Sequence, residues 1–317
     1  MPSPSAKVAW LPYPDLGEAE SRIGGFPDGV EVECFTDEQD WPRSVGEVAF
    51  LVVPYLKGPE VLRRVQEMSS LEVVQTLTAG VENFVPHVPD GVHLCNAAGV
   101  HDTSTAELAL ALALASGRHL DEFARLQTTG TWQPRFGTAL ADRRVLILGY
   151  GHIGAAIEAR LAGFEVASVT RVARRARTGP PQVHPIEDLP TLLPEADVVF
   201  VIAPHTPETE GLVGAAELAA LPDGALLVNV ARGKLVDTDA LVAETGSGRL
   251  HAALDVTDPE PLPADHPLWR VPQVLVSPHV GGASTAFWPR ADRLVAAQLR
   301  RFAAGEPLEN VITSGGS

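Results

Sequence analysis

A glycine-rich turn between an apolar segment and a helical segment constrains the fold of this chain most strongly. Residues 145–148 form an apolar run of strand length, and they lead directly into Gly149, Gly151 and Gly154 in a Gly-x-Gly-x-x-Gly pattern. Residues 155–161 then have the pattern of a helix. This order of strand, turn and helix is typical of a dinucleotide-binding βαβ unit, whereas the three glycines alone would be weak evidence.

Each glycine has its own physical reason in such a turn. Gly149 permits the tight bend, Gly151 lets the backbone approach a pyrophosphate, and Gly154 allows the helix to pack closely on the strand. The backbone amides of His152 and Ile153 would point at the pyrophosphate from the helix N-terminus, where the helix dipole favours anions. The alternative is a glycine-rich βα turn without a ligand, which the unbroken strand, turn and helix disfavour.

Short apolar segments alternate with helical stretches along the chain. Segments of strand length occur at 8–11, 30–35, 48–53, 73–77, 145–148, 165–170, 198–202, 225–230, 251–256 and 274–277. Helices are predicted at 59–68, 103–116 and 285–304. Alternation of this kind indicates parallel βαβ units and an α/β class. The two series of segments, with a boundary near Gly99, predict two α/β domains.

Length, charge and cysteine content exclude several classes of protein. At roughly 150 residues per domain, 317 residues suggest about two domains, each able to bury a core. A net charge of −16 repels phosphate backbones and anionic lipid, so we expect neither nucleic acid nor a membrane as partner. The first residues lack a secretory signal pattern, and the apolar run 106–115 is too short to span a bilayer. Cys34 and Cys95 have no metal-type spacing, so we expect reduced thiols, no metal and a cytoplasmic location.

The end of the strand after the glycine-rich turn distinguishes between the two nicotinamide cofactors. A carboxylate there would bind the ribose of NAD, but Glu165 comes at the start of the predicted strand 165–170. That strand ends instead at Thr170 and Arg171, without an acid. Guanidinium groups gather at and after this point, at Arg171, Arg174, Arg175 and Arg177. A guanidinium fork suits a 2′-phosphate, so we predict NADP(H), with NAD(H) or an ordinary solvated basic loop as the alternatives.

Polar residues follow three later strands, at the edge where open α/β sheets bind ligands. They lie in the segments 229–233, 255–261 and 277–282. Reduction of a carbonyl needs a cation for the substrate carboxylate, a proton donor, and a group that orients the donor. Arg232 could bind the carboxylate and the carbonyl, His279 could donate the proton, and Glu260 could orient His279. Each of them taken singly could equally be an ordinary surface or loop residue, and their spacing alone does not show that they converge.

Together these motifs resemble the D-isomer-specific 2-hydroxyacid dehydrogenase family over most of the chain. The matching segments are 149–154, 204–209, 229–233, 255–261 and 278–282. The resemblance implies Arg232, Glu260 and His279 as the catalytic trio. It also implies that Asp255 contacts the nicotinamide carboxamide and that Pro204 lies near the adenosine.

The same resemblance suggests further cofactor and substrate residues. The other cofactor-binding candidates in the matching segments are Thr209, Val230 and Gly281. Early in the chain, residues 78–81 look like the family's substrate loop, whose backbone amides, at Ala79 and Gly80, help to bind the carboxylate. Tyr55 and Leu56 fall where family members often line the substrate pocket.

The resemblance also implies a discontinuous domain organisation. Residues 1–98 with 288–317 would form the substrate domain, and residues 99–287 the inserted dinucleotide-binding Rossmann domain. The fold would be α/β, with two Rossmann-like or flavodoxin-like parallel-sheet domains separated by a cleft, and the protein a homodimer through its cofactor domains. Thr170 departs from the family, in which many members carry the NAD-selecting aspartate there. Thr257 and Asp258 replace the more usual aromatic–acidic pair.

We therefore expect an NADPH-dependent reductase of small 2-keto acids such as glyoxylate or hydroxypyruvate. A phosphoglycerate- or phosphite-type dehydrogenase of the same family is one alternative. A non-catalytic, dinucleotide-sensing protein like the family's corepressor branch is another, and it would keep the same trio. Formate dehydrogenases carry a glutamine where Glu260 stands, which disfavours that activity.

Overall fold

The computed structural model describes residues 6–37 and 41–313, and the chain divides into two compact units. The first unit contains residues 1–101 and 285–317, and the second contains residues 102–284. The boundaries expected from the sequence, 98/99 and 287/288, lie a few residues away from these. The first unit is thus built from two separate stretches of sequence, and the second from one.

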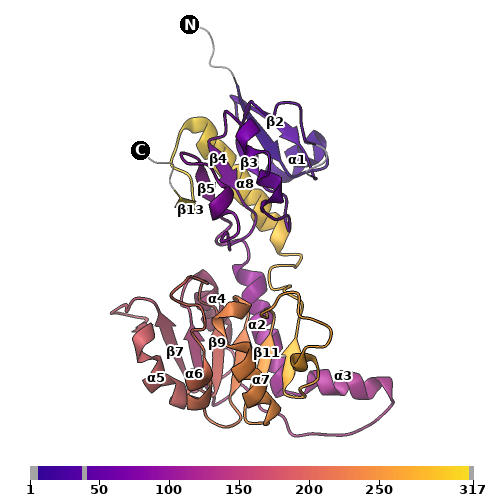
Figure 1. Cartoon of the computed structure of the whole chain (residues 1–317), viewed down its shortest axis with the longest axis vertical. Coiled ribbons are helices and arrows are strands. Elements are labelled where there is room, and N and C mark those ends of the chain that lie inside the picture. Colours follow the sequence, from indigo (N-terminus) through magenta and orange to yellow (C-terminus); the bar gives the residue numbers. More distant parts are fainter. Residues whose placement is uncertain (1–5, 38–40, 314–317) are drawn as a thin grey trace. The chain divides into compact units, whose positions relative to one another are not determined.

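The first unit contains a six-stranded sheet with the order β13-β5-β4-β3-β1-β2 (Figure 1). Its strands are β1 (Lys7–Leu11), β2 (Val30–Cys34), β3 (Val48–Val52), β4 (Val73–Gln75), β5 (His93–Cys95) and β13 (Val311–Thr313). All neighbouring pairs are parallel except β13 with β5. Alternate residues of β1 enter two different cores, one of which includes α1 (Leu16–Ile23) and α8 (Phe287–Ala304). Helices therefore cover one face of this sheet, while 3-10 turns and loops cover the other.

The second unit contains a seven-stranded parallel sheet with the order β12-β11-β10-β9-β6-β7-β8. Its strands are β6 (Arg144–Leu148), β7 (Ser168–Ala173), β8 (His184–Pro185), β9 (Val198–Val201), β10 (Leu226–Asn229), β11 (His251–Leu254) and β12 (Val274–Val276). One core includes α2 (Asp102–Gly117) and α4 (His152–Leu161). The other includes α5 (Leu189–Leu192), α6 (Ala215–Ala220) and α7 (Thr238–Gly246). Helices on both faces of a parallel sheet make this unit doubly wound, the class that the alternating segments predicted.

The strand order places a ligand crevice at the end of β6. From β6 the chain continues outward through β7 and β8, and it then returns to β9 on the other side of β6. In doubly wound sheets ligands bind at the carboxyl ends of the strands, where the order reverses in this way. The glycine-rich turn begins directly after β6, at this point.

Two segments differ from the sequence prediction. The helix predicted at 59–68 consists of two short 3-10 turns, Pro59–Leu62 and Val65–Glu67. The turns bury Val61, Leu62 and Val65, so the apolar spacing identified the buried face correctly but the type of helix wrongly. The strand predicted at 165–170 is β7, which begins and ends three residues later because it pairs with β6 from Ser168 onward.

The described residues give further observations that bear on function. None of their helices combines the length and the apolar character that crossing a bilayer requires. No group of three or more histidine, cysteine or acidic side chains among them could hold a metal ion. Both cysteines, Cys34 and Cys95, are free thiols.

Candidate active site

Glu260 and His279 come together at the carboxyl ends of two neighbouring parallel strands. Their loops follow β11 and β12, and Nδ1 of His279 lies 2.5 Å from Oε1 of Glu260. The side chain of His279 is 45% exposed and that of Glu260 is 41% exposed, so the pair is open to a ligand. The structure thus joins the expected proton donor to the residue expected to orient it.

Arg232 follows β10, the strand beside β11, and its side chain is half-buried. Its loop packs against the loop that leads to Glu260, because a Cβ on Gly233 would collide with the backbone of Thr257. Asn229 holds the turn, since its side-chain amide donates a hydrogen bond to the carbonyl of Arg232 at 2.9 Å. The three expected catalytic residues therefore lie in loops after three adjacent strands.

A buried carboxylate, Asp255, fixes the loop that carries His279. One carboxylate oxygen accepts from the hydroxyl of Ser277 at 2.5 Å and from the amide of Val280 at 2.9 Å, and the other accepts from the amide of Gly281 at 2.7 Å. The amide of His279 also donates to the carbonyl of Asp255 at 2.8 Å. His279 has a φ of 52°, a left-handed conformation that costs a non-glycine residue about 1–3 kcal/mol. These hydrogen bonds hold His279 in that conformation.

The glycine-rich turn has the shape that a dinucleotide pyrophosphate needs. Gly149 has a φ of 108°, and a Cβ there would lie 2.6 Å from the Cα of Ala203 after β9. A Cβ on Gly154 would collide with the carbonyl of Gly149. A Cβ on Gly151 would meet no atom within 4 Å, so open space lies in front of this backbone.

Helix α4 begins at His152, directly after the turn. The first N–H groups of a helix have no partner within the helix, so the amides of His152 and Ile153 can donate to a ligand. The side chain of His152 is 73% exposed, and its Nδ1 lies 3.7 Å from Oδ2 of Asp102 at the start of α2. Open space and N–H donors meet here, and the residues present fit a dinucleotide.

Strand β7 places Thr170 and Arg171 differently from the prediction. The strand continues to Ala173, so both residues lie inside it rather than at its end. Nε of Arg171 donates to Oε2 of Glu158 on α4 at 2.7 Å, and this hydrogen bond lowers the pKa of Glu158. The prediction that the strand ends at Arg171 was wrong, because pairing with β6 carries the strand past it.

Two exposed arginines, Arg174 and Arg175, directly follow β7. This end of the strand lies beside the glycine-rich turn, since the amide of Gly149 donates to a carbonyl oxygen of β7 at 2.8 Å. The guanidinium of Arg177 donates to the carbonyl of Tyr150 within the turn. Guanidinium groups are therefore available beside the turn, although that of Arg171 is engaged elsewhere.

Pro204 and Thr209 lie in the turn after β9, on the other side of β6. Pro204 is exposed, whereas Thr209 is buried and its hydroxyl donates to the carbonyl of Pro204 at 2.8 Å. Thr209 thus shapes the turn that presents Pro204. Val230 and Gly281 are also buried, so a cofactor could reach these two residues mainly through their backbones.

The expected carboxylate-binding loop lies in the first unit, after β4. The side-chain amide of Asn96 donates to the carbonyl of Ala79 at 2.7 Å, and the hydroxyl of Thr78 donates to the carbonyl of Gly80 at 2.8 Å. Ala79 and Gly80 are both half-buried. Hydrogen bonds to these carbonyl oxygens hold the loop in a defined shape.

The expected pocket residues Tyr55 and Leu56 lie in the same unit. Tyr55 stacks on Phe287 with ring centroids 3.9 Å apart, and Leu56 is 76% exposed with a φ of 64°. His101 also stacks on Phe287, at 5.3 Å, and its Nε2 lies 2.8 Å from the carbonyl of Leu77. Sequence reasoning missed His101 and Phe287, because no local motif marks residues that only tertiary packing brings to Tyr55.

Comparison with known proteins identifies the family. Residues 110–281 match the model for the NAD binding domain of D-isomer specific 2-hydroxyacid dehydrogenases. The chain belongs to the D-isomer-specific 2-hydroxyacid dehydrogenase family. It is accordingly an NAD(P)-dependent D-2-hydroxyacid dehydrogenase, built from two parallel-sheet α/β domains.

Similar proteins match this chain over nearly its whole length. Glyoxylate reductase from Pyrococcus horikoshii is 33% identical over 90% of this chain and 91% of its own. The crystal structure of a D-isomer specific 2-hydroxyacid dehydrogenase from Xanthobacter autotrophicus in complex with NADPH and MES is 31% identical, with a TM-score of 0.80 over 98% of each chain. An NADPH-dependent glyoxylate/hydroxypyruvate reductase from Sinorhizobium meliloti, in complex with NADP and malonate, is 26% identical, with a TM-score of 0.78 over 98% of each chain.

Sequence reasoning also missed the residues that hold the loops of the candidate catalytic residues. Asn229 and Ser277 hold the turns of Arg232 and His279 through the hydrogen bonds described above. They stand in the polar segments 229–233 and 277–282, and their signal was a polar residue directly at the end of a buried strand. That signal marks a place at the sheet edge without showing which partner the side chain reaches.

Proposed function

We propose that this dehydrogenase uses NADPH to reduce small 2-keto acids, such as glyoxylate or hydroxypyruvate, to D-2-hydroxy acids. The 2.5 Å contact between Nδ1 of His279 and Oε1 of Glu260 is the observation that supports this most. A histidine whose Nδ1 is held by a carboxylate presents Nε2 for proton transfer. Its place after β12, at the carboxyl edge of the sheet, is where a substrate reaches a doubly wound fold.

Three side chains have separate roles in the proposed reduction. Arg232 binds the substrate carboxylate with its guanidinium fork and polarises the carbonyl oxygen. NADPH held at the glycine-rich turn would supply a hydride for the carbonyl carbon. The proton on Nε2 of His279 passes to the carbonyl oxygen as the C=O π bond breaks, and solvent then reprotonates the imidazole. Glu260 keeps the ring oriented by accepting the hydrogen bond from Nδ1.

The preference for NADPH rests on the arginines that follow β7. Arg174 and Arg175 are exposed and directly follow the strand that pairs with the glycine-rich turn, where they would contact a 2′-phosphate. Arg171, which the sequence also suggested, instead pairs with Glu158, and we assign it to holding β7 against α4. The NADPH and NADP named with two similar structures support this cofactor, and NAD(H) is the alternative.

We further propose that the first unit supplies the substrate-binding residues. The loop of Ala79 and Gly80 would bind the carboxylate through backbone amides, and Tyr55 and Leu56 would line the pocket. The second unit would then be the dinucleotide domain. The exposed Leu56 side chain, at 76%, leaves an apolar surface that a ligand can cover.

The assembly we propose is a homodimer formed through the second unit, working in the cytoplasm. Helix α3 (Leu120–Thr128) buries none of its residues, and the segment after it carries Trp132 and Phe136 at 96% and 103% exposure. Such fully exposed aromatic side chains are typical of a surface that a partner covers. The two free cysteines are compatible with a reducing compartment.

A substrate and cofactor panel tests the activity. We expect turnover of glyoxylate or hydroxypyruvate with NADPH, and a decrease in kcat of about 10²- to 10⁴-fold in His279→Ala, because the general acid is lost. Absence of turnover with every keto acid would overturn the reaction, and a strong preference for NADH would overturn the cofactor. Faster conversion of 3-phosphohydroxypyruvate, or oxidation of phosphite, would assign the related activity instead.

A double variant tests the cofactor assignment separately. In Arg174→Ala/Arg175→Ala the KM for NADPH should rise about 10- to 100-fold, because charge-assisted hydrogen bonds to the phosphate are lost. The KM for NADH should stay unchanged. Arg43→Ala/Arg270→Ala removes the same charge from two other exposed positions and serves as the control. An equal effect of the two double variants on the KM for NADPH would contradict the assignment.

A further inference from the structure

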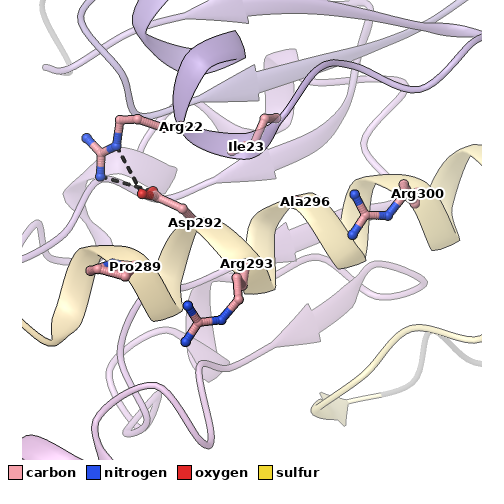
Figure 2. A pocket seen from close by; sticks show the side chains of 7 residues that line it. All are labelled: Arg22, Ile23, Pro289, Asp292, Arg293, Ala296 and Arg300. Carbon is pink, nitrogen blue, oxygen red and sulfur yellow. Dashed lines mark hydrogen bonds and ion pairs between the residues drawn. The ribbon is translucent and has the colours of Figure 1, made fainter.

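A cavity of about 630 Å³ lies on the first unit, between α1 and α8, apart from every residue assigned to the reaction. Its lining comes from two segments far apart in sequence: Arg22, Ile23, Pro289, Asp292, Arg293, Ala296 and Arg300. Figure 2 shows Arg22 on α1 facing Asp292 on α8, with Arg293 and Arg300 projecting from α8. The cavity therefore combines three guanidinium groups with a single carboxylate.

That carboxylate is already satisfied by groups of the protein. Arg22 donates to both oxygens of Asp292, at 3.1 and 3.0 Å, and the hydroxyl of Tyr13 donates at 2.9 Å. Burial raises the pKa of Tyr13, so the hydroxyl stays protonated and keeps donating. Asp292 is only 9% exposed. The negative charge of Asp292 is thus paired with Arg22 and does not neutralise Arg293 or Arg300.

Arg293 and Arg300 supply the free positive charge of the cavity. They lie two turns apart on α8, roughly 10 Å along its axis, so they project from the same side of the helix. Both are exposed, and within residues 6–37 and 41–313 neither forms an ion pair. In a chain with a net charge of −16, two unpaired guanidinium groups on one helix face give a local potential that attracts anions.

The surface between these two arginines is apolar. Ala296 lies between them on α8 and lines the cavity together with Ile23, and each of these two residues is 6% exposed. A guanidinium fork binds carboxylate or phosphate groups through paired hydrogen bonds. The ligand that matches this lining has an apolar body and a negative group at each end.

We propose that the cavity between α1 and α8 binds an organic dianion, with one anionic group on Arg293, the other on Arg300, and the apolar body over Ile23 and Ala296. Arg22 stays with Asp292 and forms the wall of the site. Dicarboxylates and bisphosphates share this chemistry, and the experiment distinguishes them.

Isothermal titration of the full-length protein with pimelate, a seven-carbon dicarboxylate, tests the site. The titration uses the Arg232→Gln variant, which removes the carboxylate-binding guanidinium proposed for the active site, so the result does not depend on catalysis. We expect one pimelate per chain, and binding of the monoanion heptanoate at least tenfold weaker. Fructose 1,6-bisphosphate, titrated in parallel, shows whether phosphate groups are preferred.

Charge reversal on α8 provides the decisive comparison. In the Arg232→Gln background, the further change Arg293→Glu/Arg300→Glu should weaken binding of the dianion at least tenfold. The control Arg43→Glu/Arg270→Glu changes the net charge by the same amount and should leave binding unchanged. Arg293→Lys/Arg300→Lys keeps both charges but loses the guanidinium fork, so it should bind the dianion more tightly than the charge-reversed variant does, which separates loss of charge from loss of fold. Equal effects of the two charge reversals, heptanoate binding as tight as pimelate, or no binding of either dianion at millimolar concentration would each overturn the proposal.

Discussion

A single buried carboxylate is hydrogen-bonded to the loop that carries His279, the candidate proton donor. Asp255 accepts hydrogen bonds from three groups of the loop around His279, and its own carbonyl accepts the amide of His279. Asp255 is 2% exposed, and its hydrogen bond with the amide of Gly281 is buried. A Cβ on Gly281 would lie 2.9 Å from Oδ2 of Asp255, so a larger residue there would displace this carboxylate. We therefore infer that Asp255 positions His279.

Replacing Asp255 by asparagine tests this role. The new NH₂ group would face N–H donors, so at least one hydrogen bond is lost and the loop of His279 is released. We expect the free energy of unfolding to fall by about 1–3 kcal/mol, and kcat to fall about 10- to 100-fold through misplacement of the imidazole. Urea unfolding and steady-state kinetics measure the two effects.

The neighbouring exposed acid gives the matched control for this variant. Asp258→Asn should change neither the free energy of unfolding nor kcat, since the exposed side chain of Asp258 lies outside the hydrogen bonds of Asp255. An Asp255→Asn enzyme with normal kcat and only a raised KM for the cofactor would show that Asp255 serves the nicotinamide instead.

At the level of elements, neighbours distant in sequence decided where each strand begins and ends. Apolar spacing located β6 correctly, but it placed β7 three residues too early, because β7 is bounded by its pairing with β6. The same effect moved Arg171 into the strand, beside Glu158 on α4. At 59–68 the apolar spacing fitted two 3-10 turns as well as a helix, since both bury the same side chains.

His251, the first residue of β11, should make the stability of the protein depend on pH. Burial, together with the nearby His119, lowers the pKa of His251. The folded state therefore binds fewer protons at this residue than the unfolded state, whose histidine pKa is about 6.5. The contribution of His251 is complete above that value and is lost as the pH falls toward the lower pKa of the folded state.

Urea unfolding at several pH values between 7 and 5 measures this effect. We expect the free energy of unfolding to fall less steeply with decreasing pH in His251→Gln than in the wild type. Replacement of the exposed His87 by glutamine is the control and should leave the slope unchanged. Identical slopes for wild type and His251→Gln would contradict the prediction.

At the scale of the whole molecule, the second unit carries an apolar surface that its own residues leave exposed. Helix α3 and the segment after it extend from this unit (Figure 1). Trp132 and Phe136 are almost fully exposed, and Leu120 is 53% exposed. Exposing aromatic rings to water costs about 25 cal/mol per Å² of apolar surface, so covering them in a homodimer would be favourable.

Sedimentation velocity tests the proposed homodimer. We expect the wild type to sediment as a dimer and Trp132→Ser/Phe136→Ser as a monomer, because the apolar contact is lost. Leu16→Ser/Val85→Ser changes two exposed apolar residues of the first unit and should remain dimeric. A monomeric wild type, or a dimer unaffected by loss of both aromatic side chains, would contradict this assembly.

The sequence by itself determined the α/β class and the glycine-rich turn, and it singled out Arg232, Glu260 and His279 as candidate catalytic residues. These features are local: alternation of strand and helix segments, a turn bounded by both, and polar residues directly after buried strands. The contact between Glu260 and His279 follows from the sheet edge to which both strands lead, so the motif anticipated it.

Only the tertiary structure decided which side chains meet across long stretches of sequence. Arg171 with Glu158, Asp255 with the loop of His279, and the cavity that joins α1 to α8 all depend on packing between separate elements. The periodicity of apolar residues indicates the buried face of one segment. The partner of a side chain depends instead on the register and distance of another segment. For this reason the glycine-rich turn and the arginines near it could be identified from the sequence, whereas the pairing of Arg171 with Glu158 could not.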